Sequence, residues 1–329
     1  MNSITDLLHK PVKKSVDKNA LFTQILVPRL LFPPSVLLLS IVLASCALPP
    51  GGNGQGDEPA AVLADTAMHA NVGFDQVLAL PVAVGHRRIA YGDDPLQFGT
   101  LWLAAGNPNP DSQTQTQAPT IVFIHGGCWL NAFDISHTYA ASAALADAGF
   151  NVWSLEYRRT GDAGGGWPGT FADIQQGINQ LAQLAPMGVS SRDVVLMGHS
   201  AGGHLALLAG SQAAALEVSV SRVIGLAAIT DVIAYGRGTN DCQTAAAPFI
   251  GASYAANPDA YRAANPASHG LHPGSLLLHG NADTIVPLAQ TEQVDARVVV
   301  SNGAGHFDWV HPGTPAFAML LRVLEESDD

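Results

Sequence analysis

The sequence is poor in charge and in lysine. Only 13% of its 329 residues are Asp, Glu, Lys or Arg, whereas 47% are hydrophobic. This composition excludes an intrinsically disordered chain, and the length suffices for one large domain or two small ones. No lysine follows Lys18, and the formal net charge is −12. Because an acidic surface repels phosphate backbones, we expect no nucleic-acid partner.

Cysteine is also scarce, and patterns typical of metal sites are absent from the sequence. The three cysteines, Cys46, Cys128 and Cys242, are too few for a scaffold built on disulfides. No C-x-x-C or H-E-x-x-H pattern occurs, so the spacing of residues predicts no metal site. We therefore expect a protein that needs neither a metal nor an organic cofactor.

The first 45 residues differ in charge from the rest of the chain. They hold five basic and two acidic residues, and they contain the apolar run 36–43 followed by small residues before Cys46. This order is typical of an export signal, and the run is too short for a comfortable membrane span. The block Leu43-Ala-Ser-Cys46 resembles the bacterial lipobox, which implies that Cys46 begins the mature chain and carries a lipid. An ordinary signal peptide or a buried helix is the alternative.

We interpret residues 1–45 as the export signal, 46–69 as a flexible tether and 70–329 as one large domain. The tether is rich in Pro and Gly and cannot bury an apolar face. Roughly 35 residues precede the apolar run, which is long for such a signal, and a translation start downstream of Met1 would explain this. We expect an exported protein, anchored to a membrane by its lipid and facing the periplasm or the cell surface.

Within the large domain, short apolar runs alternate with helical patterns. The run 120–124 is continuously apolar, as in a strand that is buried on both faces. This alternation predicts an α/β fold, with a mostly parallel central sheet and helices on both faces. Residues 231–272 lack the alternation, and we interpret them as a small cap insertion. We predict an antiparallel ribbon (80–90 and 98–104), a polar linker (107–118), strands at 120–124, 151–157, 193–197, 223–229, 275–278 and 297–300, and helices at 137–148, 171–185, 204–212 and 315–326.

One Gly-rich turn provides a candidate nucleophile. The block Gly198-His-Ser200-Ala-Gly202 fits the pattern G-x-S-x-G, in which a sharp strand-to-helix turn exposes the serine hydroxyl. The five-residue pattern alone is weak, but an apolar strand precedes it and a helical segment follows it. This setting favours Ser200 as a nucleophile over an incidental serine in a turn.

A second Gly-rich turn, His125-Gly-Gly-Cys-Trp129, follows the predicted strand 120–124. It resembles the HGG motif of esterases and lipases. The resemblance implies an oxyanion hole formed by the backbone N–H of Gly127 or Cys128 together with that of Ala201. A tight turn without a catalytic role is the alternative. We expect the other residues of the motif to support the loop or the substrate: His125, Gly126 and Trp129.

An acid and then a histidine should follow the nucleophile in the chain. Asp283 lies just beyond a predicted strand, in a segment that resembles the G-x-x-D-x-x-V-P segment carrying the acid of such triads. His306 follows the last strand in a Gly-rich loop that can bring an imidazole over the sheet edge. Asp231 and His311 are the rival acid and base. In these roles Ser200 attacks an acyl carbon, His306 transfers the proton and Asp283 orients the imidazole.

Residues 90–326 together resemble the α/β-hydrolase superfamily, and within it the esterase, feruloyl-esterase-like and kynurenine-formamidase-like group. The resemblance implies an α/β-hydrolase catalytic domain that cleaves a carboxylic ester of small to medium size. One departure is Cys128, where many relatives carry an aromatic residue or Gly. The likeness rests on Tyr91-Gly92, on the two Gly-rich motifs, and on Glu156-Tyr-Arg158, Trp167-Pro168 and Phe171-Ala-Asp173.

The sequence leaves open other functions and the question whether two of the cysteines are paired. A formamidase or an aminopeptidase-like amide hydrolase is the alternative to a serine esterase. A non-catalytic binding module on the same fold is more remote, because such modules usually lack a triad member.

Outside the cytoplasm Cys128 and Cys242 could form a disulfide that ties the oxyanion loop to the cap. We nevertheless predict two free buried thiols.

Overall fold

A computed structural model of the protein describes residues 71–81, 85–105 and 118–326. The predicted export signal, the tether, Cys46 and most of the linker 107–118 lie outside these residues. No helix in the described part of the chain is long and apolar enough to cross a membrane.

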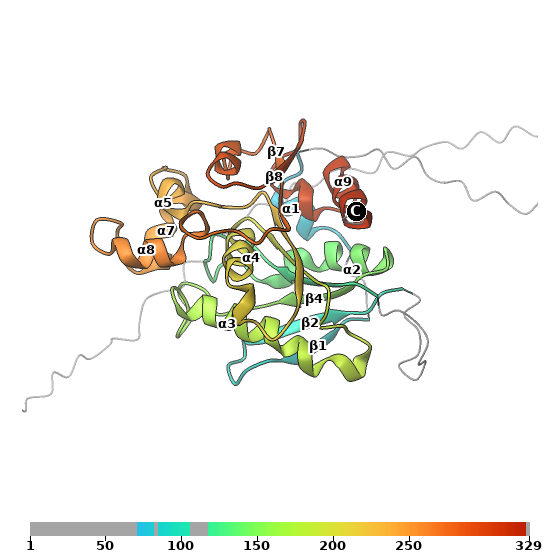
Figure 1. Ribbon diagram of the computed structural model, residues 1–329. Helices are drawn as coiled ribbons and strands as arrows, with labels where there is room; N and C mark the ends of the chain where they lie inside the picture. The colour runs from blue at the N-terminus through green and yellow to red at the C-terminus, as the bar shows by residue number, and fades with distance from the viewer. Residues whose placement is uncertain (1–70, 82–84, 106–117, 327–329) are drawn as a thin grey trace, which may run out of the picture. The chain divides into compact units, whose positions relative to one another are not determined.

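An eight-stranded sheet in the order β1-β2-β4-β3-β5-β6-β7-β8 runs through the domain (Figure 1). β1 pairs antiparallel with β2, and β2 pairs antiparallel with β4, whereas all remaining neighbouring strands are parallel. The predicted mostly parallel sheet and its antiparallel ribbon are therefore confirmed. The strands are β1 (Arg87–Ala90), β2 (Phe98–Trp102), β3 (Thr120–Ile124), β4 (Asn151–Leu155), β5 (Val194–His199), β6 (Val220–Leu226), β7 (Ser275–Gly280) and β8 (Arg297–Ser301).

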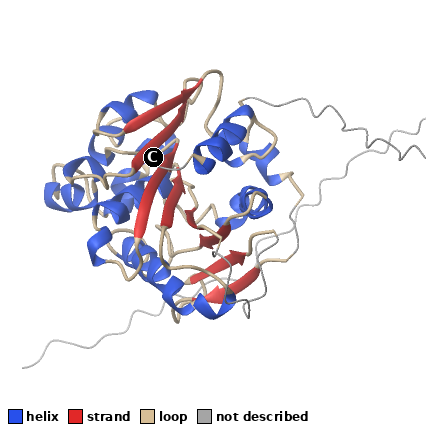
Figure 2. Ribbon diagram, turned by 45° about the vertical axis from the view of Figure 1, so that its right-hand side comes forward, coloured by secondary structure: helices blue, strands red, loops and turns tan. Residues whose placement is uncertain are grey.

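Helices cover both faces of the sheet, as Figure 2 shows. Successive residues of a strand point to opposite faces, so Ile121 and Phe123 belong to one core and Val122 and Ile124 to the other. The first core includes residues of α2 and α9, and the second includes residues of α3 and α4. The helices are α1 (Phe74–Leu78), α2 (Tyr139–Asp147), α3 (Gly169–Asn179), α4 (Ala201–Ser211), α5 (Val232–Tyr235), α6 (Asp241–Thr244), α7 (Ala246–Ile250), α8 (Pro258–Ala264) and α9 (Pro315–Glu325).

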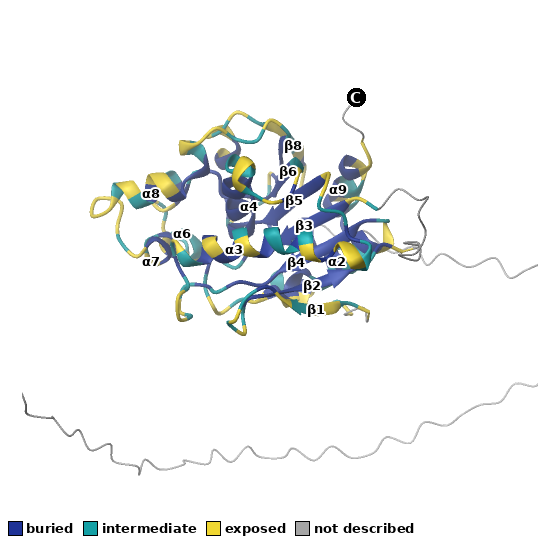
Figure 3. Ribbon diagram, turned by 60° about the horizontal axis from the view of Figure 1, so that its bottom comes forward, coloured by how far each residue is buried: buried dark blue, intermediate teal, exposed yellow. Residues whose placement is uncertain are grey.

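Some boundaries differ from the predictions. The helix predicted from residue 204 begins at Ala201, directly after the candidate nucleophile, because the Gly-rich turn leads straight into it. Helix α1 was not predicted, since five residues are too few to display a helical period. The segment 231–272 contains short helices, and Figure 3 shows exposed residues on α8 at the edge of the molecule, whereas the central strands are buried.

Candidate active site

Ser200 occupies a sharp turn between β5 and α4. Its φ of 58° and ψ of −121° lie where residues other than glycine are rare, a conformation that costs about 1–3 kcal/mol. Its N–H donates to the Leu226 carbonyl oxygen at 2.9 Å, which helps to hold the turn. A Cβ at Gly202 would overlap the Ile124 carbonyl oxygen, so the motif needs glycine at that position. The turn lies at the carboxyl edge of the parallel strands, where α/β folds place their sites.

His306 and Asp283 form a buried pair at the same edge of the sheet. The His306 Nδ1 lies 2.7 Å from the Asp283 Oδ2, and the side chains of both residues are almost completely buried. A carboxylate can only accept, so Nδ1 carries the proton and Nε2 of the neutral ring keeps its lone pair. This tautomer is the one that a general base requires.

Asp283 is fixed as an ionised acceptor. Its Oδ1 accepts the backbone N–H groups of Ile285 at 2.8 Å and Val286 at 2.9 Å. Burial by itself would raise the pKa of this carboxyl, but the bond to His306 and these two N–H groups outweigh it and lower the pKa below its usual value. Asp283 is therefore charged at neutral pH.

The rival residues lie elsewhere. The Asp231 carboxylate caps α5 by accepting the N–H of Ile233 at 2.8 Å and of Ala234 at 3.0 Å. The His311 Nδ1 accepts the N–H of Gly313 at 3.1 Å. Within the described part of the chain, neither Asp231 nor His311 lines the cavity that contains Ser200.

A cavity of about 640 Å³ brings Ser200 and His306 together. Gly127 and Cys128 of the second Gly-rich turn line it as well. Among the described residues, no cluster of three or more His, Cys, Asp or Glu side chains could hold a metal ion. The rest of the cavity wall is largely apolar and comes from six separate segments of the chain: Phe74, Leu130, Ala132, Phe133, His137, His199, Asn240, Asp241, Cys242, Thr284, Ile285 and Phe307.

The predicted oxyanion loop lies directly against the nucleophile turn. A Cβ at Gly126 would lie 2.8 Å from the His199 carbonyl oxygen and 3.0 Å from the Ser200 Cβ. Within residues 71–81, 85–105 and 118–326, no acceptor is found for the backbone N–H groups of Gly127 and Cys128. Ala201 is the first residue of α4, so its N–H has no partner within the helix. The loop and the helix thus bring unpaired donors to the cavity that Ser200 lines.

Two successive residues of this loop are held in the left-handed region. Cys128 has a φ of 53° and Trp129 a φ of 58°, although neither is glycine. The Trp129 indole stacks on Phe249 of the cap, with ring centroids 4.8 Å apart, and donates to the His204 Nδ1 at 3.2 Å. Contacts with distant segments therefore maintain a loop conformation that the local sequence disfavours.

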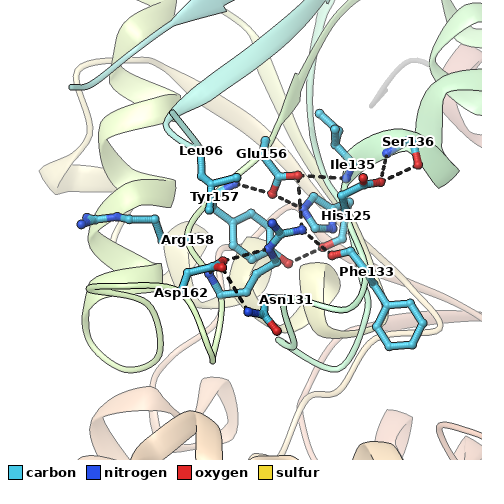
Figure 4. Close-up of polar contacts among 12 residues, drawn as sticks. Leu96, His125, Asn131, Phe133, Ile135, Ser136, Glu156, Tyr157, Arg158 and Asp162 are labelled. Atoms are coloured by element: carbon cyan, nitrogen blue, oxygen red, sulfur yellow. Dashed lines mark hydrogen bonds and ion pairs between the residues drawn. The ribbon is translucent and has the colours of Figure 1, made fainter. Parts of the chain in front are cut away.

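A network of buried charged side chains contacts the predicted oxyanion loop (Figure 4). The Glu156 carboxylate contacts the His125 Nε2 at 2.9 Å and accepts the N–H of Ile135 at 3.1 Å and of Tyr157 at 2.8 Å. Arg159 completes the network at 3.4 Å from Glu156. Burial would raise the pKa of Glu156, but His125 and Arg159 lower it below its usual value. Glu156 is therefore ionised, and its carboxylate links His125 to the backbone of Ile135 and Tyr157.

His125 links this network to the loop backbone. Its Nδ1 lies 2.7 Å from the Gly126 carbonyl oxygen, while its Nε2 faces Glu156. Both ring nitrogens thus face acceptors, and His125 forms both hydrogen bonds only when both nitrogens carry protons. Its ring also stacks on Tyr157 with centroids 4.3 Å apart. The role of His125 in supporting the loop stays a prediction. Glu156 and Arg159 belong to the same network, and the sequence analysis did not name them as site residues.

The prediction of two free thiols is wrong. Cys128 and Cys242 form a disulfide, with their Cα atoms 5.0 Å apart and a separation of 114 residues in sequence. It joins the oxyanion loop to α6 of the cap, and both residues line the cavity. The prediction failed because proximity of the two thiols depends on how the cap folds back over the strand ends.

His199 was missed as well, although it lies within the G-x-S-x-G motif. Its Nε2 donates to the His306 carbonyl oxygen at 2.9 Å, which fixes the backbone of the candidate base. Burial lowers the pKa of His199 well below its usual value, and the nearby His306 and His137 lower it further. His199 is therefore neutral, and it lines the cavity without adding charge.

The chain is similar in sequence to curated proteins. Curated relatives include Esterase LipC and Esterase LipQ of Mycobacterium tuberculosis, each 26% identical, over 275 and 243 residues. These alignments cover 74% and 68% of the chain but only 66% and 56% of the relatives. The chain thus spans less than two thirds of the length of these curated relatives.

Solved structures and a family model complete the comparison. Esterase B of Lactobacillus rhamnosis is similar with a TM-score of 0.62 and 20% identity, over 76% of this chain and 88% of that one. This similarity shows the α/β-hydrolase fold. The model of the BD-FAE family matches residues 109–298, which is more than half of the chain. The protein is therefore a member of the BD-FAE family with an α/β-hydrolase fold.

Proposed function

We propose that the protein is a serine hydrolase that cleaves carboxylic esters of small to medium size through an acyl-enzyme. One observation carries the proposal. A serine on a strained strand-to-helix turn lines the same cavity as a histidine whose Nδ1 is bound to a buried, ionised carboxylate. The esterase names of the curated relatives support the same chemistry.

The proposed reaction follows from the roles of these three side chains. The Ser200 Oγ attacks the acyl carbon, and its proton passes to His306 Nε2, which carries the free lone pair. His306 then donates that proton to the leaving alcohol, and the acyl group remains on Ser200. Water next attacks the acyl-enzyme and loses a proton to His306, which returns it to the Ser200 Oγ as the bond to the acyl group breaks and the carboxylic acid leaves. Throughout, Asp283 holds the imidazole and stabilises its charged form.

The oxyanion of each tetrahedral intermediate would be bound by backbone donors. The N–H groups of Gly127 or Cys128 and of Ala201 are available beside Ser200. Loss of one such donor typically raises the barrier by about 2.7–4 kcal/mol. The network of His125 and Glu156 would keep the loop in position, since the donors belong to the backbone and depend on its conformation.

Hydrolysis of p-nitrophenyl acetate, butyrate and octanoate tests the proposal, with Ser200→Ala as the matched variant. We expect the variant to lose about 10⁴-fold or more in kcat while retaining the fold. Equal turnover by wild type and variant would contradict the proposal. If neither hydrolyses any ester although both are folded, formamide and peptide substrates become the next assays, and then ligand binding without catalysis.

We further propose that residues 1–45 direct export and that Cys46 carries a lipid that anchors the protein to a membrane, facing the periplasm or the cell surface. The order of basic residues, apolar run and lipobox-like block supports this. The test is the mass of the mature N-terminus after bacterial expression of the full chain. We expect a lipid-modified Cys46 in the membrane fraction and release of a Cys46→Ala variant. An unmodified Cys46 would contradict the anchor.

A further inference from the structure

Helix α1 forms part of the active-site wall. Phe74 of α1 lines the cavity together with Phe133 and Phe307. Its ring centroid lies 5.5 Å from that of Phe133 and 5.4 Å from that of Phe307. These three rings give the cavity an aromatic end, and they come from segments more than fifty residues apart.

A buried carboxylate fixes α1 to the loop of the candidate base. Asp308 accepts the N–H of Asn71 at 2.6 Å and of Val72 at 2.7 Å on its two oxygens. The same carboxylate accepts the N–H of Gly305 at 3.2 Å, next to His306. Asp308 is fully buried, and Val72 lies in the core on the α9 side of the sheet. Phe74 is therefore held in place rather than free to move away from the cavity.

Other residues of the cavity wall have a different chemical character. Asn240, Asp241 and Thr284 are polar, and they line the cavity together with Cys242 of the cap. An ester placed at Ser200 extends in two directions from its carbonyl carbon. One half can enter the aromatic end, where apolar groups gain by burial, and the other meets polar side chains.

We propose that Phe74 is a specificity-determining residue that limits the length of the apolar substrate half entering the aromatic end. This inference rests on the proposed ester hydrolysis. Each methylene that a longer chain buries is worth about four-fold in kcat/KM. Phe74 occupies the space in which additional methylenes would lie. The kcat/KM of the wild type therefore rises little when the apolar chain of the substrate is lengthened.

The test uses the full chain and the variants Phe74→Ala, Phe74→Trp and Leu78→Ala. Leu78 is the matched control, since it lies on the same helix but is 51% exposed and outside the cavity lining. One substrate series varies the acyl half, as p-nitrophenyl acetate, butyrate and octanoate. The other varies the alcohol half, as ethyl, butyl and octyl acetate. The readout is the ratio of kcat/KM for the longest and the shortest member of each series.

We expect Phe74→Ala to raise that ratio at least about ten-fold in one of the two series, which identifies the half that enters the aromatic end. Phe74→Trp should lower the same ratio, and Leu78→Ala should leave it unchanged. Unchanged ratios in both series for both Phe74 variants, or an equal shift in Leu78→Ala, would overturn the inference. Failure of the proposed function looks different, because wild type would then hydrolyse acetate no faster than Ser200→Ala.

The role of Asp308 has its own readout. In Asp308→Asn we expect faster hydrogen exchange at the N–H groups of Asn71 and Val72, together with a length ratio shifted in the direction of Phe74→Ala. The ratio is compared rather than the rate, since Asp308 also contacts the loop of His306. Unchanged exchange at both amides would show that Asp308 does not hold α1.

Discussion

The candidate catalytic side chains and the walls around them are built in different ways. Ser200, Asp283 and His306 each follow a parallel strand, β5, β7 or β8, within a few residues. The walls come from α1, the oxyanion loop and the cap, which meet through contacts between distant segments. In the proposed reaction the first region supplies the reacting side chains, and the second determines the shape of the cavity and the placement of the backbone donors. Substitutions in the two regions should therefore have different effects.

Apart from Ser200→Ala, the largest effect is expected at the carboxylate that follows β7. We expect Asp283→Asn to lower kcat by on the order of 10⁴-fold, because an amide cannot hold the imidazole in the required tautomer. Asp231→Asn is the matched control, since Asp231 caps α5 and lies apart from the cavity lining. Kinetics on p-nitrophenyl butyrate measure both. Comparable losses in the two variants would contradict the assignment of the acid.

A smaller loss is expected when the support of the oxyanion loop is weakened. We expect Glu156→Gln to lower kcat about 10²-fold with little change in KM, since displaced donors act mainly on the transition state. The same change should lower the free energy of unfolding by about 3–5 kcal/mol, because His125 and Arg159 lose their buried partner. Asp162→Asn serves as the control, since Asp162 also contacts Arg159 but leaves the contact between Glu156 and His125 intact. A change in KM alone would argue against the bracing role.

Reduction of the disulfide tests the connection between loop and cap. We expect reduction by a phosphine to lower kcat about ten-fold, equal to about 1.4 kcal/mol, as the left-handed residues of the loop relax. The free energy of unfolding should fall by about 2–5 kcal/mol. The Cys128→Ser/Cys242→Ser double variant should resemble the reduced protein and should not respond to the phosphine. Full activity of the reduced protein, verified by its mass, would contradict this prediction.

The smallest effect concerns pH and stability rather than catalysis. Burial lowers the pKa of His204 to about 4 and, together with the nearby His125, that of His137 to about 3. Unfolded histidine has a pKa near 6.5, so the unfolded chain binds more protons below that pH. The stability that these rings contribute is thus complete above about pH 6.5 and is lost as the pH falls towards 4. Each should change the free energy of unfolding by about 1.4 kcal/mol per pH unit.

Urea unfolding between pH 7.5 and 4.5 checks this slope. We expect His204→Gln to reduce the slope of the free energy of unfolding against pH by about 1.4 kcal/mol per pH unit, since one titrating group is removed. His269→Gln, at an exposed histidine, should retain the wild-type slope. A slope in His204→Gln equal to that of wild type would contradict a buried neutral His204.

The sequence by itself predicted the parallel sheet, the nucleophile turn and the pair of His306 and Asp283. Each of these depends on a local pattern: an apolar run, a glycine at a crowded turn, or a polar residue just after a strand. The carboxyl ends of parallel strands meet at one edge of a sheet, so three local patterns were enough to predict that these residues meet.

Only the tertiary structure decided how the site is enclosed. Asn71 and Asp308 are 237 residues apart in sequence, and Cys128 and Cys242 are 114 apart. Helix α1 is too short to show a period, and the cap has no regular alternation. Such contacts arise from packing of whole elements and leave no local pattern. The sequence therefore could not decide between a disulfide and two free thiols, and it did not predict the aromatic end or the contacts of Glu156.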